Sequence, residues 1–290
     1  MCSSRSRRTD VACSHDPTPD RRRGPLSVED PIEVNRAGWN LRTAIHLESD
    51  FYNLKGWKAG QCSLQAIEKQ EVGDVQGLDL LHLQCHFGLD TLSWARRGAR
   101  VTGCDLSDAA IAAATELAQE TDLPARFFRC NLFDLPDHLD DTFDIVFTSY
   151  GVLGWLPDLA PWGQLIARYL KPGGFFYMVE FHPIVWMFDD TFEGIQYAYH
   201  NSGPILTENS GSYTDRGADV HYRDYGWNHS LSEIVNSLLR AGLSLEFLNE
   251  FPYSPYPNLP RSIRGDDGHY RIEGLEEKFP LLFSLKARAR

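Results

Sequence analysis

Short apolar runs alternate with segments of helical periodicity from residue 78 of this 290-residue chain onward. The first run, residues 78–85 (LDLLHLQC), is apolar with little interruption, as in a strand buried on both faces of a sheet. The next segment places Leu89 and Leu92 on one helical face and ends at Gly98. This alternation is typical of a parallel sheet whose strands are joined by crossover helices, so it indicates an α/β fold.

Similar signals place the other elements of the sheet. Ser107 is a good N-cap for a helix with apolar residues at helical spacing, and the sequence KPGG at 171–174 ends a helix at 164–170. Strands are predicted at 78–85, 100–105, 125–130, 143–150 and 175–181.

The pattern changes after the fifth strand. Residues 183–228 are aromatic, rich in glycine and irregular, and an insertion of this length is expected to be functional. Ser230 and Glu233 then form an S-x-x-E capping box at the start of a helix that ends at Gly242. Two last strands are predicted at 243–250 and 281–287, with the loop 251–280 between them, and two helices are predicted within 33–70.

Composition limits what the chain can bind. Hydrophobic residues make up 42% and charged residues 23%, which is ordinary for a globular protein. Residues 1–24 carry a formal charge of +3 and little apolar surface, whereas the rest carries −15. We therefore expect a disordered basic tail at 1–24 and a single domain at 25–290. A nucleic acid partner is not expected, because wrapping its backbone requires basic surface.

Targeting signals and cysteines favour a cytoplasmic protein. The tail lacks the apolar core of a secretory signal, and no apolar stretch approaches the ~18 residues of a membrane span, so no membrane partner is predicted. The six cysteines include no CxxC pair, which suits reduced thiols rather than disulfides or zinc. Nothing in the sequence indicates an oligomeric state.

Ligands of an open parallel sheet bind beyond the carboxyl ends of its strands, and suitable residues follow three of the strands here. Gln84, Cys85 and Gly88 follow the first strand. Asp105 ends the second strand, where a carboxylate commonly accepts both ribose hydroxyls of a nucleotide-like cofactor. Asn131 follows the third strand, and its amide is suited to contact the edge of an adenine.

Five sequence segments resemble the class I S-adenosylmethionine-dependent methyltransferases. They are LLHLQCHFG at 80–88, VTGCDLS at 101–107, RCNLFDLP at 129–136, FDIVFTSYGVLGWLPDL at 143–159 and LKPGG at 170–174. The chain is most similar to a bacterial small-molecule branch in which LQCHFG replaces the usual acidic-x-Gly-x-Gly-x-Gly loop. The resemblance implies a Rossmann-like α/β fold with a mostly parallel seven-stranded sheet and a terminal antiparallel strand. It also implies helices on both faces, an N-terminal helical extension and an insertion after strand five.

The resemblance further implies S-adenosyl-L-methionine as the cofactor and S-adenosyl-L-homocysteine as the product. A dinucleotide is disfavoured because the sequence contains no GxGxxG. The loop departs from the family, since His82 stands where an acid is usual and Gln84 and His86 stand where glycines are usual. We expect the Gln84 amide to contact the methionine moiety instead. The predicted cofactor-binding residues are Gln84, Cys85, Gly88, Asp105, Leu106, Asn131, Leu132 and Tyr150.

Methyl transfer is an in-line displacement at a sulfonium carbon, so the protein mainly aligns acceptor and methyl group and excludes water. A general base helps when the acceptor is a hydroxyl, a protonated amine or a carbon acid. His182 and Glu180 lie two residues apart at the end of the fifth strand and should share one face of it. We predict His182, Glu180 and Tyr150 as catalytic residues, with His182 the first choice of base because imidazole titrates near neutrality. The alternative for His182 and Glu180 is that loop backbone satisfies both side chains.

Three segments are predicted to cover the acceptor site: the helical lid 33–70, the insertion 183–228 and the loop 251–280. The last two are rich in aromatic residues, which suits an apolar pocket for a small molecule, and we expect one from specialised metabolism. The predicted acceptor-binding residues are Trp155, Trp186, Trp227, Tyr253 and Arg264.

A carbon methyltransferase that acts on an Mg²⁺-bound prenyl diphosphate is an alternative. Adjacent aspartates and a local basic cluster motivate it, because such groups hold a metal and a phosphate. We favour instead the pairing of these arginines with Asp266 and Asp267, so Mg²⁺ is not favoured and no metal site is predicted. The residues concerned are Asp189, Asp190, Arg261, Arg264, His269 and Arg271.

Two functions of different classes also compete with small-molecule methylation. A non-catalytic S-adenosylmethionine-binding protein would explain the altered glycine loop. Methylation of nucleic acid is disfavoured by the negative charge, and also because TSYG at 148–151 stands in place of an Asn/Asp-Pro-Pro-Tyr-like motif.

Overall fold

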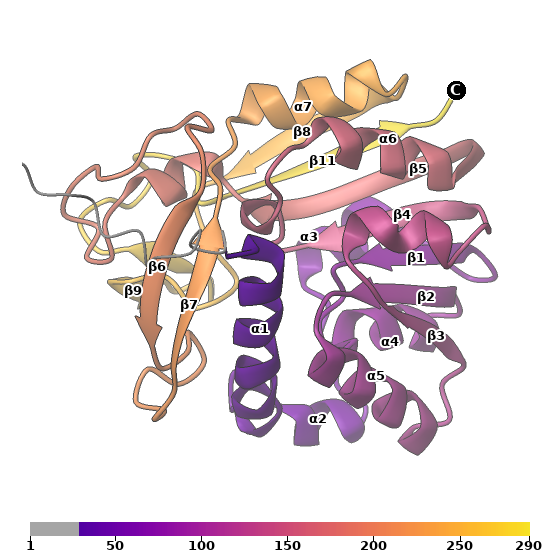
Figure 1. The fold of residues 1–290 in the computed structure, drawn as a ribbon, viewed down its shortest axis with the longest axis horizontal. Helices are drawn as coiled ribbons and strands as arrows, with labels where there is room; N and C mark the ends of the chain where they lie inside the picture. The colour runs from indigo at the N-terminus through magenta and orange to yellow at the C-terminus, as the bar shows by residue number, and fades with distance from the viewer. Residues whose placement is uncertain (1–28) are drawn as a thin grey trace, which may run out of the picture. The chain divides into compact units, whose positions relative to one another are not determined.

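The computed structural model describes residues 29–290, so the predicted tail at 1–24 lies outside the described part. Its largest sheet has seven strands in the order β3-β2-β1-β4-β5-β11-β8 (Figure 1). Strand β11 runs antiparallel to both of its neighbours, and the other adjacent pairs are parallel. The predicted Rossmann-like α/β architecture is confirmed. The strands are β1 (Asp79–Leu83), β2 (Arg100–Asp105), β3 (Ala125–Arg129), β4 (Phe143–Ser149), β5 (Leu170–Phe181), β8 (Ser244–Phe251) and β11 (Leu282–Arg288).

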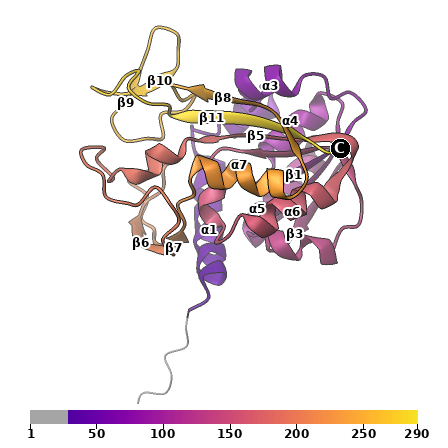
Figure 2. The ribbon, with the colours of Figure 1, turned by 90° about the horizontal axis from the view of Figure 1, so that it is seen from above.

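Helices cover both faces of this sheet, and α3 and α7 lie on opposite sides of it (Figure 2). On one face, Trp162 of α6 and Leu238 of α7 pack with Leu81 of β1. On the other, Trp94 of α4 packs with Leu80 of the same strand. Because successive side chains of β1 point to opposite faces, both faces of β1 are buried. The helices are α3 (Ala66–Val72), α4 (Leu89–Arg96), α5 (Asp108–Glu120), α6 (Ala160–Tyr169) and α7 (Leu231–Arg240).

The predicted starts of α5 at Ser107 and of α7 at Ser230 are confirmed, whereas the predicted start of α6 is wrong. Ser107 Oγ accepts the Ala110 N–H at 3.1 Å and so caps α5. Ser230 caps α7 in the same way, but the Glu233 carboxylate lies 3.1 Å from His229 Nδ1, so the reciprocal half of the box is absent there. Helix α6 begins at Ala160 rather than 164, because the proline that follows fits the first turn, where its missing N–H costs nothing.

The segment before the sheet forms three helices rather than two: α1 (Pro31–Glu48), α2 (Leu54–Lys58) and α3. Figure 1 shows α1 between the carboxyl ends of the parallel strands and strand β7 (His221–Gly226). The Asn35 side chain fixes this position, since it accepts the Tyr225 N–H at 2.7 Å and donates to the Tyr225 carbonyl at 2.8 Å. Among residues 29–290, no helix combines the length and apolarity needed to cross a membrane.

The two segments predicted to be irregular contain strands. Within 183–228, a one-turn helix η3 (Pro183–Met187) is followed by an antiparallel hairpin of β6 (Ile205–Ser210) and β7. A second hairpin, β9 (Ser262–Arg264) and β10 (Tyr270–Ile272), lies within 251–280. Residues in β6 alternate between half-buried and exposed, so this strand offers too weak an apolar pattern to be recognised from sequence.

Candidate functional site

A cavity of about 830 Å³ lies beyond the carboxyl ends of strands β1 to β4. Its position coincides with the switch point between β1 and β4, where chain order along the sheet reverses and α/β proteins bind ligands. Helix α1, residues 51–65 and the β6–β7 hairpin contribute the side chains on the opposite side. A cavity of this volume matches small-molecule sites in general.

All eight residues predicted to bind the cofactor line this cavity: Gln84, Cys85, Gly88, Asp105, Leu106, Asn131, Leu132 and Tyr150. Asp105 is held by two backbone donors, the N–H of His86 at 2.8 Å and that of Ser107 at 2.9 Å, one on each carboxylate oxygen. Burial raises the pKa of this carboxyl group. Each oxygen keeps a further lone pair, so the fixed carboxylate is suited to accept two hydroxyls of a diol.

The loop after β1 has a backbone that glycine adopts freely, yet only one of its three left-handed positions is a glycine. Gly88 has φ 80°, and a Cβ there would lie 2.9 Å from the Cβ of Ala114. Gln84 and His86 have φ 54° and 50°. For residues with a Cβ such conformations cost about 1–3 kcal/mol each, and they concentrate at functional sites. The strained backbone therefore indicates a functional role for the side chains of Gln84 and His86.

Six buried polar atoms of residues that line the cavity have no hydrogen-bond partner within the described part of the chain, and they include His82 Nε2, Asn209 Nδ2 and Asn258 Oδ1. The other three are Gln84 Oε1, His86 Nδ1 and Arg42 Nη2. Gln84 donates its amide to the Val152 carbonyl at 3.0 Å, which leaves the carbonyl oxygen unused. Buried polar atoms are normally paired, so these three indicate a polar ligand.

Arg42 is the only arginine of α1 that lines the cavity, and it is 3% exposed. Its guanidinium carbon lies 3.9 Å from the ring centre of Trp39 and 4.7 Å from that of Tyr222. The Asp224 carboxylate is 3.9 Å from Nη1, which is an ion pair without a hydrogen bond. The aromatic rings therefore hold the Arg42 guanidinium in place, while its Nη2 group has no hydrogen-bond acceptor among the described residues.

A buried imidazole joins three segments of the wall. His46 Nδ1 lies 2.8 Å from His86 Nε2, and His46 Nε2 lies 2.7 Å from Ser212 Oγ. Burial lowers the pKa of His46 to about 3, so this imidazole is neutral at pH 7. Sequence reasoning missed Arg42 and His46. The available signal is a run of buried polar residues at helical spacing in α1, which includes Asn35, Arg42 and His46.

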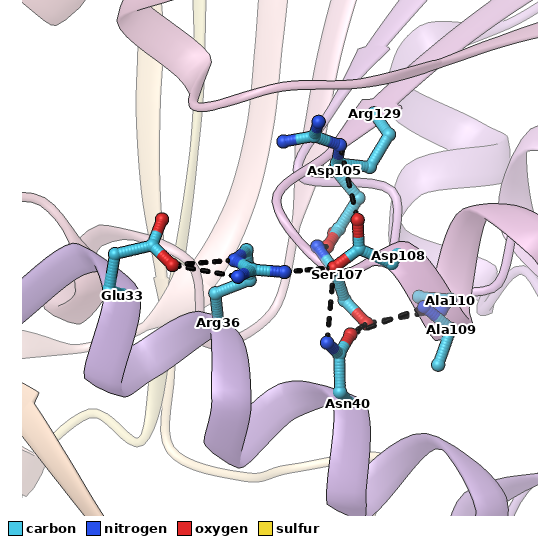
Figure 3. A network of polar contacts seen from close by, with 9 residues as sticks. All are labelled: Glu33, Arg36, Asn40, Asp105, Ser107, Asp108, Ala109, Ala110 and Arg129. Carbon is cyan, nitrogen blue, oxygen red and sulfur yellow. Dashed lines mark hydrogen bonds and ion pairs between the residues drawn. The ribbon is translucent and has the colours of Figure 1, made fainter.

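Helix α1 is also fixed to the start of α5, next to Asp105 (Figure 3). Asn40 Oδ1 accepts the Ser107 hydroxyl at 2.7 Å and the Ala109 N–H at 3.2 Å, and its amide donates to Asp108 at 3.1 Å. Arg36 bonds to Asp108 as well. The helix is thereby positioned over the strand end that carries the fixed carboxylate.

The expectation that Glu180 and His182 reach the acceptor pocket is wrong in position, because neither residue lines the cavity. The Glu180 carboxylate accepts the backbone N–H groups of Val152 at 2.7 Å and Leu153 at 3.2 Å, so it shapes the loop after β4. His182 Nδ1 accepts the Ile184 N–H at 3.2 Å, while its Nε2 lies 3.0 Å from Glu250. Backbone N–H groups therefore occupy the Glu180 carboxylate and His182 Nδ1, and His182 Nε2 faces Glu250 rather than the cavity.

Tyr150 does line the cavity, and its hydroxyl donates to Glu68 Oε2 at 3.0 Å. Glu68 belongs to α3 and is fully buried. Its other oxygen accepts the Gln65 N–H. Burial, with the charge of Asp90 adding, raises the pKa of Glu68 to about 7.

Two of the five residues predicted to contact the acceptor, Trp155 and Trp186, line the cavity. Trp227, Tyr253 and Arg264 do not, which corrects the prediction for them. Trp227 is packed in the interior. The other two lie near the β9–β10 hairpin, where Tyr253 stacks on His269 at 4.1 Å and Arg264 donates to a hairpin carbonyl.

Of the residues that motivated a metal-bound diphosphate, Asp189 and Asp190 line the cavity, and Asp189 and the arginines have local partners. Asp189 Oδ1 accepts the hydroxyl of Thr191 and the N–H of Glu193, as in a turn. Arg271 pairs with Asp267 at 2.9 Å and Glu277 at 3.0 Å. In the range 29–290, no group of three or more potential metal ligands is present. The basic cluster also lies outside the cavity lining.

Residues 81–178 match a family model described as a methyltransferase domain. This segment of the chain is therefore similar to a methyltransferase domain. A ubiquinone biosynthesis O-methyltransferase of Alkalilimnicola ehrlichii is 36% identical to it over 105 residues, which are 36% of this chain and 42% of that protein. The alignment thus spans less than half the length of this relative.

Solved structures of methyltransferases share the fold of this chain. An S-adenosylmethionine-dependent methyltransferase from Mesorhizobium loti superposes with a TM-score of 0.52 at 22% identity, over 77% of this chain and 95% of that one. The complex of DhpI with SAH gives a TM-score of 0.53 at 18% identity, over 89% and 97%. At these identities the likenesses concern the fold alone.

Proposed function

We propose that this protein transfers a methyl group from S-adenosyl-L-methionine to a small-molecule acceptor. The observation that carries the proposal is the set of unpartnered atoms of Gln84, His86 and Arg42, which surround a cavity of a methyltransferase domain. The methionine end of the cofactor presents one ammonium and one carboxylate. Gln84 Oε1 is an acceptor suited to the ammonium, whereas the Arg42 guanidinium is a donor suited to the carboxylate.

The remaining contacts follow the order of the strands. Asp105 would hold the ribose hydroxyls, and Asn131 would contact the adenine edge beside Leu106 and Leu132. When bound, the cofactor supplies an activated methyl group on a sulfonium. The chain's own residues hold the two reactants in line and keep water out of the cavity.

The other part of the cavity, over β4 and β5, would hold the acceptor. Aromatic side chains from separate segments line the cavity, which suits a small, largely apolar molecule. We favour a hydroxyl as the acceptor group, supported by the relative named as an O-methyltransferase. The expectation of a specialised metabolite stays a prediction. The aromatic residues that line the cavity include Tyr52, Tyr150, Trp155, Trp186, Tyr213 and Tyr256.

Isothermal titration calorimetry of residues 1–290 tests the cofactor assignment. We expect one saturable site for S-adenosylmethionine and for S-adenosylhomocysteine, and no heat of binding for NAD⁺. Absence of binding to both sulfur compounds in the folded protein would overturn the proposal. Binding without methyl transfer to any member of a library of phenols and alcohols would favour a non-catalytic S-adenosylmethionine-binding protein.

A further inference from the structure

The hydrogen bond between Tyr150 and Glu68 joins a phenol to a carboxyl group, and such a pair can accept a proton from a bound molecule. Tyr150 follows β4, at the switch point of the sheet, and its N–H still pairs with the Val179 carbonyl of β5 at 2.9 Å. Its hydroxyl donates to Glu68 at 3.0 Å, so the phenol oxygen keeps its lone pairs for another donor. Because Tyr150 lines the cavity, that donor can be a bound molecule.

Glu68 is unusual for a buried carboxyl group. It is 0% exposed, and among residues 29–290 it forms no ion pair with a lysine, an arginine or a histidine. Buried carboxylates are normally paired with a cation, because removing a charge from water is costly. Asp90 also lines the cavity, and the Ser149 hydroxyl lies 3.3 Å from its carboxylate. Within the described part of the chain, Asp90 likewise has a hydroxyl partner rather than a cation.

We infer that Tyr150 receives the proton of a hydroxyl acceptor during methyl transfer, and that Glu68 is the positioning residue that orients Tyr150 and takes up its proton. The inference rests on the proposed methyltransferase function and names the class of its acceptor, a compound with a hydroxyl group. It replaces His182 and Glu180 in the role that the sequence suggested for them.

The step balances in atoms and charge. The acceptor oxygen forms a bond to the methyl carbon while the carbon–sulfur bond breaks, and that electron pair stays on sulfur. The acceptor proton moves to the Tyr150 oxygen, and the Tyr150 proton moves to Glu68 Oε2. One positive charge on sulfur and one negative charge on Glu68 disappear together, so no new charge is created in the buried site.

The same charges predict a linkage between cofactor binding and protonation. A sulfonium in the cavity favours ionised Glu68, whereas the neutral sulfur of S-adenosylhomocysteine does not. Glu68 has a pKa of about 7 before any ligand binds, so it is partly protonated at neutral pH. The titratable groups that face it are Asp90 of α4, Tyr150 after β4, Tyr177 of β5 and Tyr256 after β8.

Calorimetric titration of the full chain at pH 6, 7 and 8, in buffers of different ionisation enthalpy, measures this linkage without a known acceptor. We expect S-adenosylmethionine to release protons near pH 7 and to bind about five- to tenfold more weakly at pH 6 than at pH 8. S-Adenosylhomocysteine should release none and keep its affinity. Equal pH dependence for the two ligands would overturn the inference while leaving the cofactor assignment intact, whereas failure of both to bind would overturn the proposed function itself.

Two matched variants identify the titrating group. Glu68→Gln should abolish the proton release, and Asp90→Asn should keep it but move its midpoint to lower pH, because a neighbouring negative charge is removed. If Asp90→Asn abolishes the proton release and Glu68→Gln keeps it, the proton belongs to Asp90 and the role of Glu68 is overturned. If Glu68→Gln does not fold, Tyr150→Phe decides: loss of its hydrogen bond should raise the midpoint, and an unchanged midpoint would contradict the inference.

Discussion

At the scale of single residues, the loop after β1 differs from a glycine-rich loop because two of its left-handed positions carry polar side chains. Gln84 and His86 adopt left-handed conformations in positions where the resemblance predicts glycine. Both side chains present an unpartnered polar atom among the described residues that line the cavity. The departure from the glycine-rich loop is therefore compatible with cofactor binding, because side chains supply contacts in addition to backbone.

Arg42 allows the methionine end of the proposed site to be tested separately. Arg42→Lys keeps a positive charge near Asp224 but loses the planar group that lies against Trp39 and Tyr222. We expect about tenfold weaker binding of S-adenosylhomocysteine, since one charge-assisted hydrogen bond is lost. The affinity for 5′-methylthioadenosine, which lacks the amino acid portion, should be unchanged in the same titration. Equal losses for both ligands would place Arg42 elsewhere than at the methionine carboxylate.

Asp105 allows the ribose end of the proposed site to be tested in the same way. Asp105→Ala removes the carboxylate that would accept two ribose hydroxyls, which should weaken binding by about 2–3 kcal/mol. Here S-adenosylhomocysteine and 5′-methylthioadenosine should lose affinity alike, because both contain the ribose. A folded variant with unchanged affinity for either compound would remove Asp105 from the site.

At the scale of elements, the sequence predicts best where burial is continuous. The strand predicted at 100–105 coincides with β2, and the Ser107 cap is confirmed, because both signals are local. The β6–β7 hairpin escaped prediction since one face of it is in solvent and the other packs on α1, a contact between distant segments. The role of Glu180 was mispredicted for a similar reason, because three of its four backbone partners lie 27 to 29 residues away.

The docking of α1 depends on Asn40, and this gives an element-scale prediction. Asn40→Ala removes the acceptor shared by Ser107 and Ala109, at a cost of about 1–2 kcal/mol. We expect faster amide hydrogen exchange in 31–48 and weaker cofactor binding. Glu33→Gln is the control on the same helix, because it alters only an exposed pair with Arg36 and should change neither measurement. Unchanged exchange in the Asn40 variant would show that α1 is held by other contacts.

At the opposite ends of the strands, Asp79 joins β1, β2 and β5. It bonds to Arg100 and to Lys171, and these contacts lower its pKa to about 2. A depressed carboxyl pKa stabilises the fold above the unfolded value of about 4 and loses this effect as the pH falls to 2. Asp79→Asn should therefore reduce the free energy of unfolding by about 1–2 kcal/mol at pH 7, a figure discounted for solvent exposure. In urea unfolding, a difference that persists at pH 2 would contradict this assignment.

At the scale of the whole molecule, the residues predicted to bind the cofactor all line the cavity, whereas most of those predicted for the acceptor do not. Every residue predicted for the cofactor lies at a strand end, and the order of a parallel sheet brings strand ends together. The side of the cavity that faces the strand ends combines α1, residues 51–65, the β6–β7 hairpin and the loop after β8. Which residue of a long insertion faces the cavity depends on tertiary packing, so Trp186 and Trp227 could not be distinguished from sequence.

Because α1 and the β6–β7 hairpin both line the cavity and are joined through Asn35 and Tyr225, they should respond to a ligand together. A ligand held beneath them must be released before either can open. S-Adenosylhomocysteine at 100 times its dissociation constant should therefore slow amide hydrogen exchange in 31–48 and 205–226 by up to about 100-fold. The β9–β10 hairpin lies outside the cavity lining and serves as the internal control, with unchanged exchange at 262–272. Protection of α1 without the β6–β7 hairpin would mean that the hairpin covers only the acceptor, and that the two elements open independently.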